Sequence, residues 1–460
     1  MASTYLQRTP TTRTNNQKFT YSCWFKRSEL GTSQYFVINL ESGNDRGYVA
    51  FDTDNKMFIF DKAGGTDRFQ ATSNFVLRDT SAWYHLVYSV DSTAGSNRVK
   101  IYINGVDKYS DFTVATAMSQ NSTVGFQQGT VSNSFKVGSQ EAGNTTFNGL
   151  MSYINFVDGL QLDASAFGET DSTTGEWKIL TSPTVSEYGN NGFFILKDGN
   201  SVTDQSGKGN NFGIGGSVGS LTKTEDNPSN VFATMNPLWR PMNNQTYSFE
   251  KGNTRVYANS NTDWLRSNAT IGAKTGKWWY EVHLGTANNE NRIGWDSIDH
   301  SNETNQNYYS GLNVSNGSSN GDVRGGIRGT SSYSPNAIQL PADGGGNATW
   351  TQGDYLGMGI DLDNQTITIH KNGSALATNW SYAGYSGTSV LKSRGFFIAP
   401  SANWYSGSGN QNIYDFNFGN GSFNGTSLTG TTYTDSNSQG VFKYQPPTNY
   451  LAWCTKNLNV

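Results

Sequence analysis

Short runs in which apolar and polar residues alternate recur along the whole chain, about ten residues apart. Such alternation places one set of side chains on a single face of an extended strand. No long segment repeats its apolar residues with the 3.6-residue period of an amphipathic helix. The pattern therefore predicts an all-β protein, and the strand spacing is typical of β-sandwiches.

One element of this pattern occurs twice. The runs Arg98–Gly105 and Gln365–Gly373 alternate and then end in Asn-Gly, the dipeptide that supplies both positive-φ residues of a type I′ hairpin turn. A further strand is expected upstream of each run, at Trp83–Asp91 and at Tyr355–Asp361. The repeated order of strand, polar turn, strand and Asn-Gly predicts two related β-domains.

The predicted fold class is all-β, with two antiparallel jelly-roll β-sandwich domains in tandem. Residues 1–220 are assigned to the first domain and residues 239–460 to the second, with a linker over 221–238 where Gly and Pro are dense. First-domain strands are expected at Phe19–Phe25, Tyr35–Leu40, Gly47–Phe51, Lys56–Phe60, Trp83–Val90, Phe135–Gly138, Gly149–Val157 and Gly192–Leu196. Second-domain strands are expected at Lys277–His283, Asn291–Trp295, Tyr355–Lys371, Gly395–Pro400 and Tyr414–Gly419.

Composition agrees with this interpretation. The chain has 460 residues, which is long for one sandwich and suits two cores. It contains 52 Gly and only 15% charged residues, yet 13% of its residues are aromatic, so apolar mass for two cores is present. Both domains are therefore expected to fold despite the low charge.

Charge and targeting features exclude several classes of partner. The formal net charge is −4 and the Lys and Arg residues are scattered, so no basic face is predicted for nucleic acid. The N-terminal residues lack a signal-peptide pattern, and no stretch reaches the ~20 apolar residues of a membrane span, so no membrane insertion is expected. Cys23 and Cys454 are the only cysteines, and two buried free thiols are expected.

Several motifs resemble known families. The first domain resembles a laminin-G-like, concanavalin-type jelly roll in four places, which are Trp24, Trp83–His85, Ile101–Gly105 and Phe147–Tyr153. The second domain resembles a SPRY domain in Gly276–Glu281, Ile293–Trp295, Gly353–Gly357 and the Lys371–Gly373 hairpin, which keep their order along the chain.

The arrangement as a whole resembles virion proteins of tailed bacteriophages, of the tail-fibre or receptor-binding type. The segments that carry this resemblance are Asp204–Phe212, Asn230–Pro237 and Pro446–Leu458. The resemblance implies a location in the virion, on the phage tail or the virion surface.

Catalytic chemistry has little support in the sequence. Concanavalin-type hydrolases place carboxylates on one strand face, but Glu169, Asp171 and Glu176 have a spacing that does not do so. The four histidines, His85, His283, His300 and His370, lack metal-ligand spacing. Asp52–Asn55 and Asp361–Asn364 resemble calcium ligands, but their place between strands favours turns. We expect no enzyme activity, no cofactor and no metal site.

Binding is expected to involve aromatic residues in loops rich in Gly, Ser and Asn, mostly in the second domain. These residues are Tyr308, Tyr309, Tyr333, Trp380, Tyr382, Tyr385, Trp404 and Tyr405. The predicted function is non-catalytic recognition of a host-surface glycan or protein by a virion protein, as a homotrimer that also contacts other virion proteins. The alternatives are a structural virion accessory, such as a capsid decoration or tail adaptor, and thirdly a polysaccharide depolymerase.

Overall fold

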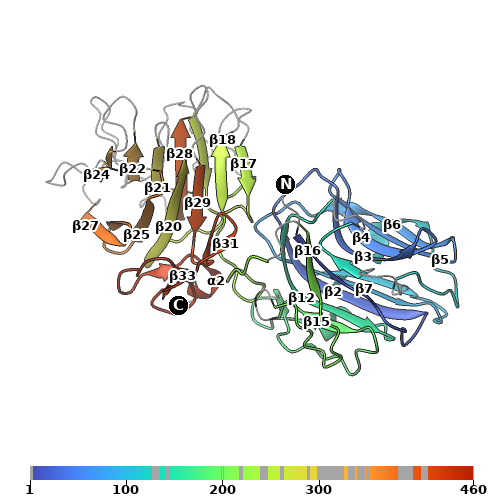
Figure 1. Cartoon of the computed structure of the whole chain (residues 1–460). Coiled ribbons are helices and arrows are strands. Elements are labelled where there is room, and N and C mark those ends of the chain that lie inside the picture. Colours follow the sequence, from blue (N-terminus) through green and yellow to red (C-terminus); the bar gives the residue numbers. More distant parts are fainter. Residues whose placement is uncertain are drawn as a thin grey trace. The chain divides into compact units, whose positions relative to one another are not determined.

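The chain forms two compact units in the computed structural model (Figure 1). The first comprises Met1–Thr222 with Asn227–Ser229, and the second Lys223–Asp226 with Asn230–Val460. The structure describes residues 4–126, 135–140, 145–197, 199, 201–216, 221–238, 247–258, 264–286, 291–297, 326–329, 337–338, 348–349, 352–381, 397–405 and 413–458. In these residues no helix is long and apolar enough to cross a membrane.

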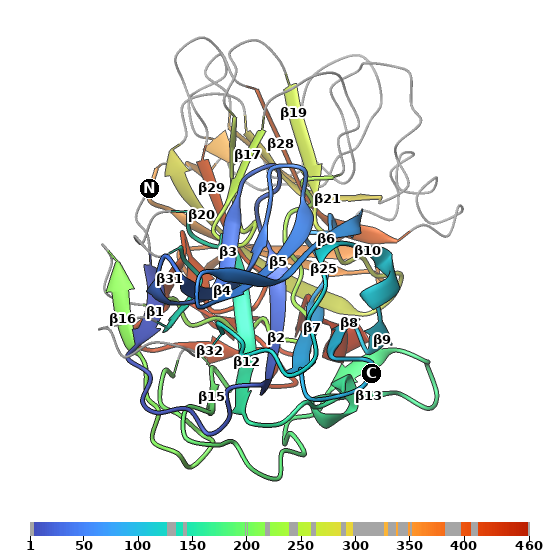
Figure 2. The ribbon, with the colours of Figure 1, turned by 90° about the vertical axis from the view of Figure 1, so that its right-hand side faces the viewer.

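The first unit is a sandwich of two antiparallel sheets. Sheet I has eight strands, in the order β10 (Phe112–Thr116), β6 (Thr66–Val76), β5 (Lys56–Ala63), β4 (Asp45–Phe51), β3 (Gln34–Ser42), β11 (Phe135–Val137), β1 (Thr4–Arg8) and β16 (Gly213–Gly216). Sheet II has six, in the order β15 (Phe193–Ile195), β12 (Gly149–Asp158), β2 (Lys18–Arg27), β7 (Tyr84–Asp91), β8 (Val99–Ile103) and β9 (Val106–Asp107). Figure 2 shows β12, β2 and β7 side by side.

Short elements complete the first unit. They are the hairpin of β13 (Gly168–Thr170) and β14 (Trp177–Ile179), and the 3-10 helices η1 (Tyr109–Asp111) and η2 (Ala164–Ala166). The η2 turn begins after Asp163 and ends before Phe167, and Ala164 and Ala166 are buried in it.

The second unit also contains two main sheets. Sheet III has the order β17 (Tyr247–Glu250), β18 (Arg255–Ala258), β29 (Ile413–Asn417), β20 (Lys277–Thr286), β25 (Tyr355–Asp361), β26 (Thr366–Lys371) and β27 (Ser374–Ser381), and β34 (Leu451–Ala452) pairs with β20 in parallel. Sheet IV has the order β19 (Trp264–Asn268), β28 (Ile398–Tyr405), β21 (Asn291–Ser297) and β22 (Gly326–Gly329). The predicted all-β class with tandem antiparallel sandwiches is confirmed.

Among its described residues, the second unit also has three short antiparallel strand pairs and one short helix. They are β23 (Ala337–Ile338) with β24 (Ala348–Thr349), β30 (Ser422–Phe423) with β31 (Thr426–Ser427), β32 (Tyr433–Thr434) with β33 (Val441–Phe442), and α2 (Thr455–Leu458).

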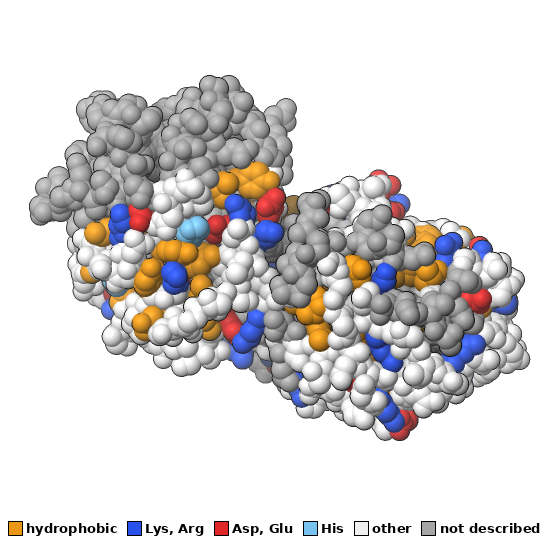
Figure 3. Space-filling model, viewed as in Figure 1, with side chains coloured by type: hydrophobic (Ala, Val, Ile, Leu, Met, Phe, Trp, Pro, Cys, Tyr) orange, Lys and Arg blue, Asp and Glu red, His pale blue; other side chains and the backbone are white. Residues whose placement is uncertain are grey.

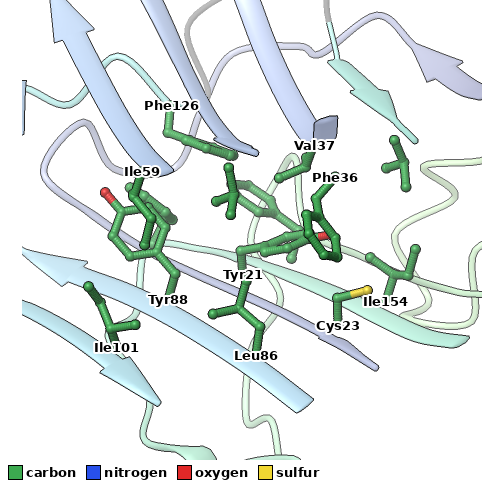
Figure 4. Close-up of a cluster of buried hydrophobic side chains, with 14 of the residues drawn as sticks. Tyr21, Cys23, Phe36, Val37, Ile59, Leu86, Tyr88, Ile101, Phe126 and Ile154 are labelled. Atoms are coloured by element: carbon green, nitrogen blue, oxygen red, sulfur yellow. The ribbon is translucent and has the colours of Figure 1, made fainter. Parts of the chain in front are cut away.

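Each sandwich encloses a core of alternating strand residues. In the first unit, Tyr21, Ile59 and Phe126 are fully buried between sheets I and II (Figure 4). Cys23 lies in this core, and Cys454 is buried in the second unit, so both are buried free thiols as predicted. Adjacent tryptophans divide between two faces of β20: Trp278 joins the sandwich core and Trp279 packs on the outer face of sheet III.

The Asn-Gly repeat predicted from the sequence is present in both units. Asn104 and Asn372 have φ of 49° in each case, and Gly105 and Gly373 follow with positive φ. The Asn104 side-chain oxygen accepts a hydrogen bond from the His85 backbone N–H at 2.8 Å. Asn372 accepts one from the Tyr355 N–H at the same distance. Each asparagine therefore ties its hairpin to the start of the preceding strand.

An additional layer covers part of an outer sheet face in each unit. On sheet II, Val87 and Val157 pack against the segment that contains η2, including Phe167. On sheet III, Trp279 packs against Phe442 and other residues of the C-terminal segment. Glycine at 357 makes room for the Trp279 ring, because a Cβ there would lie 2.2 Å from it.

A buried carboxylate fixes the C-terminal layer to sheet III. Glu281 on β20 is 1% exposed and accepts hydrogen bonds from the backbone N–H groups of Lys443 and Tyr444 at 2.9 and 2.8 Å. The Asn417 amide donates a third at 3.1 Å. Burial raises the pKa of Glu281 to about 7, against the lowering effect of these hydrogen bonds. The carboxylate sets where the segment crosses the sheet.

Two segments have more structure than their composition suggests. Residues 213–216, which fall in a Gly-rich stretch, form β16 at the edge of sheet I and pair with β1. Gly215 fits there because the Tyr5 ring lies where a Cβ would project. In the segment assigned to a linker, Phe232 and Met235 are fully buried in the cores of the second unit.

The C-terminal layer is expected to stabilise the second unit. Replacing Phe442 by Ala removes a fully buried ring next to Trp279 and should cost about 3–5 kcal/mol of unfolding free energy. Phe397→Ala is the matched control because that ring is 47% exposed, and it should cost about 0.5 kcal/mol or less. Urea denaturation of the three proteins tests this. Equal losses for the two variants would contradict a stabilising role of the layer.

Candidate functional site

Three of the eight predicted binding aromatics lie within the described residues. Five of them lie outside the described residues, namely Tyr308, Tyr309, Tyr333, Tyr382 and Tyr385. For the other three the expected loop location is wrong: Trp380 lies in β27, and Trp404 and Tyr405 lie in β28. Trp404 pairs with Leu265 on one side and with Asn291 on the other, because β28 lies between β19 and β21 and continues past Pro400.

The acidic residues near β13 form a turn. The Asp171 carboxylate accepts hydrogen bonds from the backbone N–H groups of Thr173 and Thr174 at 3.0 and 2.7 Å. It also pairs with Lys178 at 2.6 Å. These donors occupy its oxygens, which agrees with the solvated turn that the spacing of the three carboxylates indicates.

The two calcium-like motifs also form turns. Asp52 Oδ1 accepts hydrogen bonds from the backbone of Asp54 and Lys56. Asp361 accepts from the backbone of Asn364, and its other oxygen pairs with Lys277 at 3.0 Å. In the described part of the chain, no group of three or more His, Cys, Asp or Glu residues is arranged to hold a metal ion.

His85 is part of a closed stack on the outer face of sheet II. Its ring lies 4.6 Å from that of Trp24 and 6.0 Å from that of Trp177. Trp177 Nε1 donates to His85 Nδ1 at 3.1 Å, and Ser22 Oγ is 2.9 Å from Nε2. Because an indole N–H can only donate, the imidazole proton must be on Nε2 and point to Ser22. His85 therefore cannot accept a proton from Ser22, and burial lowers its pKa to about 3.

The outer face of sheet I carries a cluster of neighbouring aromatic side chains. It consists of Tyr35, Tyr48, Phe58 and Phe60, which we call the aromatic platform. The Tyr48 ring centroid lies 5.2 Å from those of Tyr35 and Phe60 and 5.8 Å from that of Phe58. All but Phe60 are partly exposed. Figure 3 shows hydrophobic side chains at the surface of the first unit, with Lys and Arg among them.

Strand register gives the platform its shape. Ala50 on β4 pairs with Tyr35 on β3 and with Phe58 on β5. Two strand spacings separate Tyr35 and Phe58 by about 9–10 Å. The Tyr48 ring lies 5.2 Å from Tyr35 and 5.8 Å from Phe58, and Ala50 is 5% exposed, so the three rings form one continuous aromatic surface over this part of the sheet.

Polar groups lie at the edge of the aromatic platform. The Arg46 guanidinium lies over the Phe60 ring at 5.4 Å from its centroid. Burial raises the pKa of Tyr48 to about 12, so its hydroxyl stays protonated and can donate a hydrogen bond near neutral pH. An apolar surface with a few polar groups at the margin suits a flat ligand that has apolar faces and polar edges.

The sequence of β5 carries a signal for this face. In Lys56–Phe60, Met57 and Ile59 alternate with Phe58 and Phe60, so both faces of the strand are apolar. The side chains on one face of this strand pack in the core. Those on the other face must either be covered by another segment or remain exposed to solvent. Sequence alone does not say which, because the answer depends on which segments fold over the sheet.

Comparisons with known proteins bear on the fold. The family model of the concanavalin A-like lectin/glucanases superfamily matches residues 2–163, the range that contains the platform. This supports the concanavalin-like resemblance of the first domain. A comparison with curated proteins finds no match.

Solved structures give weaker likenesses. The SPRY domain of human HERC1 is 15% identical, with a TM-score of 0.26, and the alignment covers 37% of this chain and 92% of that one. A proposed carbohydrate binding protein from Bacteroides ovatus is 16% identical, with a TM-score of 0.31 and coverage of 46% and 56%. A heptameric pentraxin from Limulus polyphemus is 11% identical, with a TM-score of 0.23 and coverage of 35% and 78%. None of these likenesses identifies a site in this chain.

The His85 stack predicts a histidine that stays neutral in mild acid. With a folded pKa of about 3 and an ordinary value of 6.5, the unfolded chain binds the extra proton first as the pH falls. This contribution to stability is therefore present above pH 6.5 and is lost towards pH 3. Nitrogen NMR shifts of the ring should show a neutral Nε2–H tautomer from pH 7 to about pH 4.

The Trp177→Phe variant is the control for the tautomer, because it removes the donor to Nδ1 and should let both tautomers appear. A titration midpoint of His85 near 6.5 in the wild-type protein would contradict the closed stack.

Proposed function

We propose that this chain is a non-catalytic virion protein of a tailed bacteriophage, of the tail-fibre or receptor-binding type, and that it recognises a host-surface glycan through the aromatic platform. The observation that carries the proposal is the cluster of partly exposed Tyr35, Tyr48 and Phe58 rings on the outer face of sheet I. Residues 2–163, which contain it, match a superfamily whose description includes lectins.

The chemistry of the platform suits a sugar ring. Pyranose rings present C–H groups on their faces and hydroxyls around their edges. One C–H face would lie on the aromatic rings, whose electron-rich faces prefer partially positive hydrogens. The edge hydroxyls would reach the hydroxyl of Tyr48 and the guanidinium of Arg46, which lies over the Phe60 ring. A neutral sugar therefore fits this face of sheet I.

The hydrogen bonds of two acidic residues support a binding role without catalysis. Asp171 is engaged by Thr173, Thr174 and Lys178. Asp61, a buried acid of β5, projects away from the platform and accepts hydrogen bonds from the backbone of Gly125 and Phe126. Neither pair of oxygens is offered to a ligand on the outer face.

The virion location follows from the sequence resemblance alone. A homotrimer would present three platforms and raise the avidity of weak sugar contacts. The structural accessory is the second candidate, in which the same apolar face packs on another virion protein. The two proposals differ in what binds the platform, so glycan binding by the isolated protein separates them.

Substitutions in the platform should weaken binding to host cells or to glycans on an array. Tyr48→Ala and Phe58→Ala each remove a partly exposed ring and should weaken binding about tenfold, which corresponds to roughly 1.4 kcal/mol. Flow cytometry with the labelled full-length protein, or glycan-array titration, measures the effect.

Phe397→Ala serves as the control, since it removes an exposed ring of the second unit. It should bind like the wild-type protein. Wild-type binding that is unchanged in both platform variants would refute the platform as the site, and folded wild-type protein without any glycan binding would favour the structural accessory.

A further inference from the structure

The two Asn-Gly hairpins build the same local arrangement in both units. In the first unit, His85 pairs with Trp24 on the neighbouring strand, and Trp177 packs on Gly105 of the turn. In the second unit, Tyr355 pairs with His283, and Tyr444 packs on Gly373. A Cβ on either glycine would lie within 2.7 Å of the aromatic ring above it. The two places are therefore equivalent in register.

The first-unit arrangement is closed. Trp24 and His85 are 4% and 0% exposed, and Trp177 stacks nearly parallel to the imidazole at 18°. Both ring nitrogens of His85 have partners. No polar atom of the imidazole is left for a ligand.

The second-unit arrangement is partly open. Tyr444 meets the Tyr355 ring edge-on at 68° and does not stack over it. The side chain of His283 is 23% exposed, and those of Tyr355, Tyr444 and Lys443 are partly exposed. Figure 3 shows a histidine next to hydrophobic side chains on this unit, with charged side chains of both signs at the margin.

Next to His283, charged residues of the neighbouring strands continue this arrangement across sheet III. His283 Nδ1 lies 3.2 Å from Asp415 Oδ2 on β29, and Arg255 Nε on β18 lies 3.7 Å from Oδ1. Asp415 is 1% exposed, and its Oδ1 makes no hydrogen bond in the described structure. We name Arg255, Asp415, His283 and Tyr355, with Lys443 and Tyr444 above them, the His283 row.

The polar tips of the His283 row are mainly donors without partners. In the described structure, the hydroxyls of Tyr355 and Tyr444 make no hydrogen bond, and His283 Nε2 has no partner. The Lys443 ammonium lies 4.8 Å from the Tyr355 ring centroid and 5.6 Å from that of Tyr444. Cation–π contact holds this ammonium but leaves its charge unpaired.

The acidic side chains around the row have partners. Asp415 Oδ2 lies 3.2 Å from His283 Nδ1 and Oδ1 lies 3.7 Å from Arg255 Nε, and the neighbouring Lys371 pairs with Asp354 at 2.9 Å. The carboxylate of Glu281 accepts backbone N–H groups, and its charge also acts on Lys443. Lys443 itself makes no ion pair with a carboxylate in the described structure. Phe423 lies 5.1 Å from Tyr355 and adds an apolar side.

We propose that the His283 row is a second binding site, separate from the aromatic platform, and that it binds an anionic sugar residue. The ligand's carboxylate or sulfate accepts hydrogen bonds from Lys443 Nζ and the hydroxyls of Tyr355 and Tyr444. Its ring carbons contact Tyr355 and Phe423. A charge-assisted hydrogen bond to lysine is stronger than a neutral one, so the anion dominates the affinity.

The test measures binding of the full-length protein to three immobilised polymers: polygalacturonate, heparin and uncharged dextran. The wild-type protein should bind polygalacturonate or heparin and not dextran, and the preferred polymer tells carboxylate from sulfate. Lys443→Met keeps the alkyl stem and should weaken the binding at least fivefold. Tyr355→Phe removes only a hydroxyl and should weaken it about threefold.

Lys456→Met is the matched control, because it removes an exposed lysine of the same unit, and it should bind within twofold of the wild type. Phe397→Ala, which removes an exposed ring of the same unit, should also retain the anionic binding. Thermal unfolding confirms that each variant is folded. Binding of neither anionic polymer, equal binding of dextran, or unchanged binding by folded Lys443→Met would overturn the proposal.

Discussion

Covering the outer faces of the sheets is the constraint on which the rest of the structure depends. A sandwich buries the inner faces of its two sheets, but the central strands here are apolar on both faces. Val87 on β7 and Trp279 on β20 both project outward and are fully buried. Leaving such side chains in water would forfeit about 25 cal/mol for each Å² of apolar surface. Each unit therefore folds a second segment over one outer face.

These covering segments are irregular, so buried carboxylates hold them in place. Glu281 accepts two backbone N–H groups of the C-terminal segment, and Asp435 accepts those of Gly440 and Ala452. In the first unit, Asp158 accepts the backbone N–H groups of Thr14 and Asn191. A buried backbone N–H without a hydrogen-bond partner costs about 1–3 kcal/mol. One carboxylate that accepts several of these N–H groups supplies the hydrogen bonds that a neighbouring strand would otherwise provide.

Both proposed binding sites lie where a covered or buried face gives way to partly exposed aromatic side chains. On sheet I, Tyr35, Tyr48 and Phe58 keep partial exposure. On sheet III, the C-terminal segment crosses β20 at Glu281, and His283 lies two residues further along the same strand. The equivalent place in the first unit is closed by Trp177. The same hairpin can thus support a sealed core or an accessible surface, depending on the residue above its glycine.

The sequence by itself determined the all-β class, the two Asn-Gly turns and the strands around them, because these depend on neighbouring residues and on period-two alternation. It did not indicate the long strand β6 or the edge strand β16. It also pointed to buried free thiols at Cys23 and Cys454. Tertiary structure alone decided which apolar faces are covered. Phe58 and Trp279 have similar local patterns, yet only Trp279 lies beneath Phe442, a residue far along the chain. The His283 row unites residues from four strands and the C-terminal segment, and no local spacing encodes such long-range pairing.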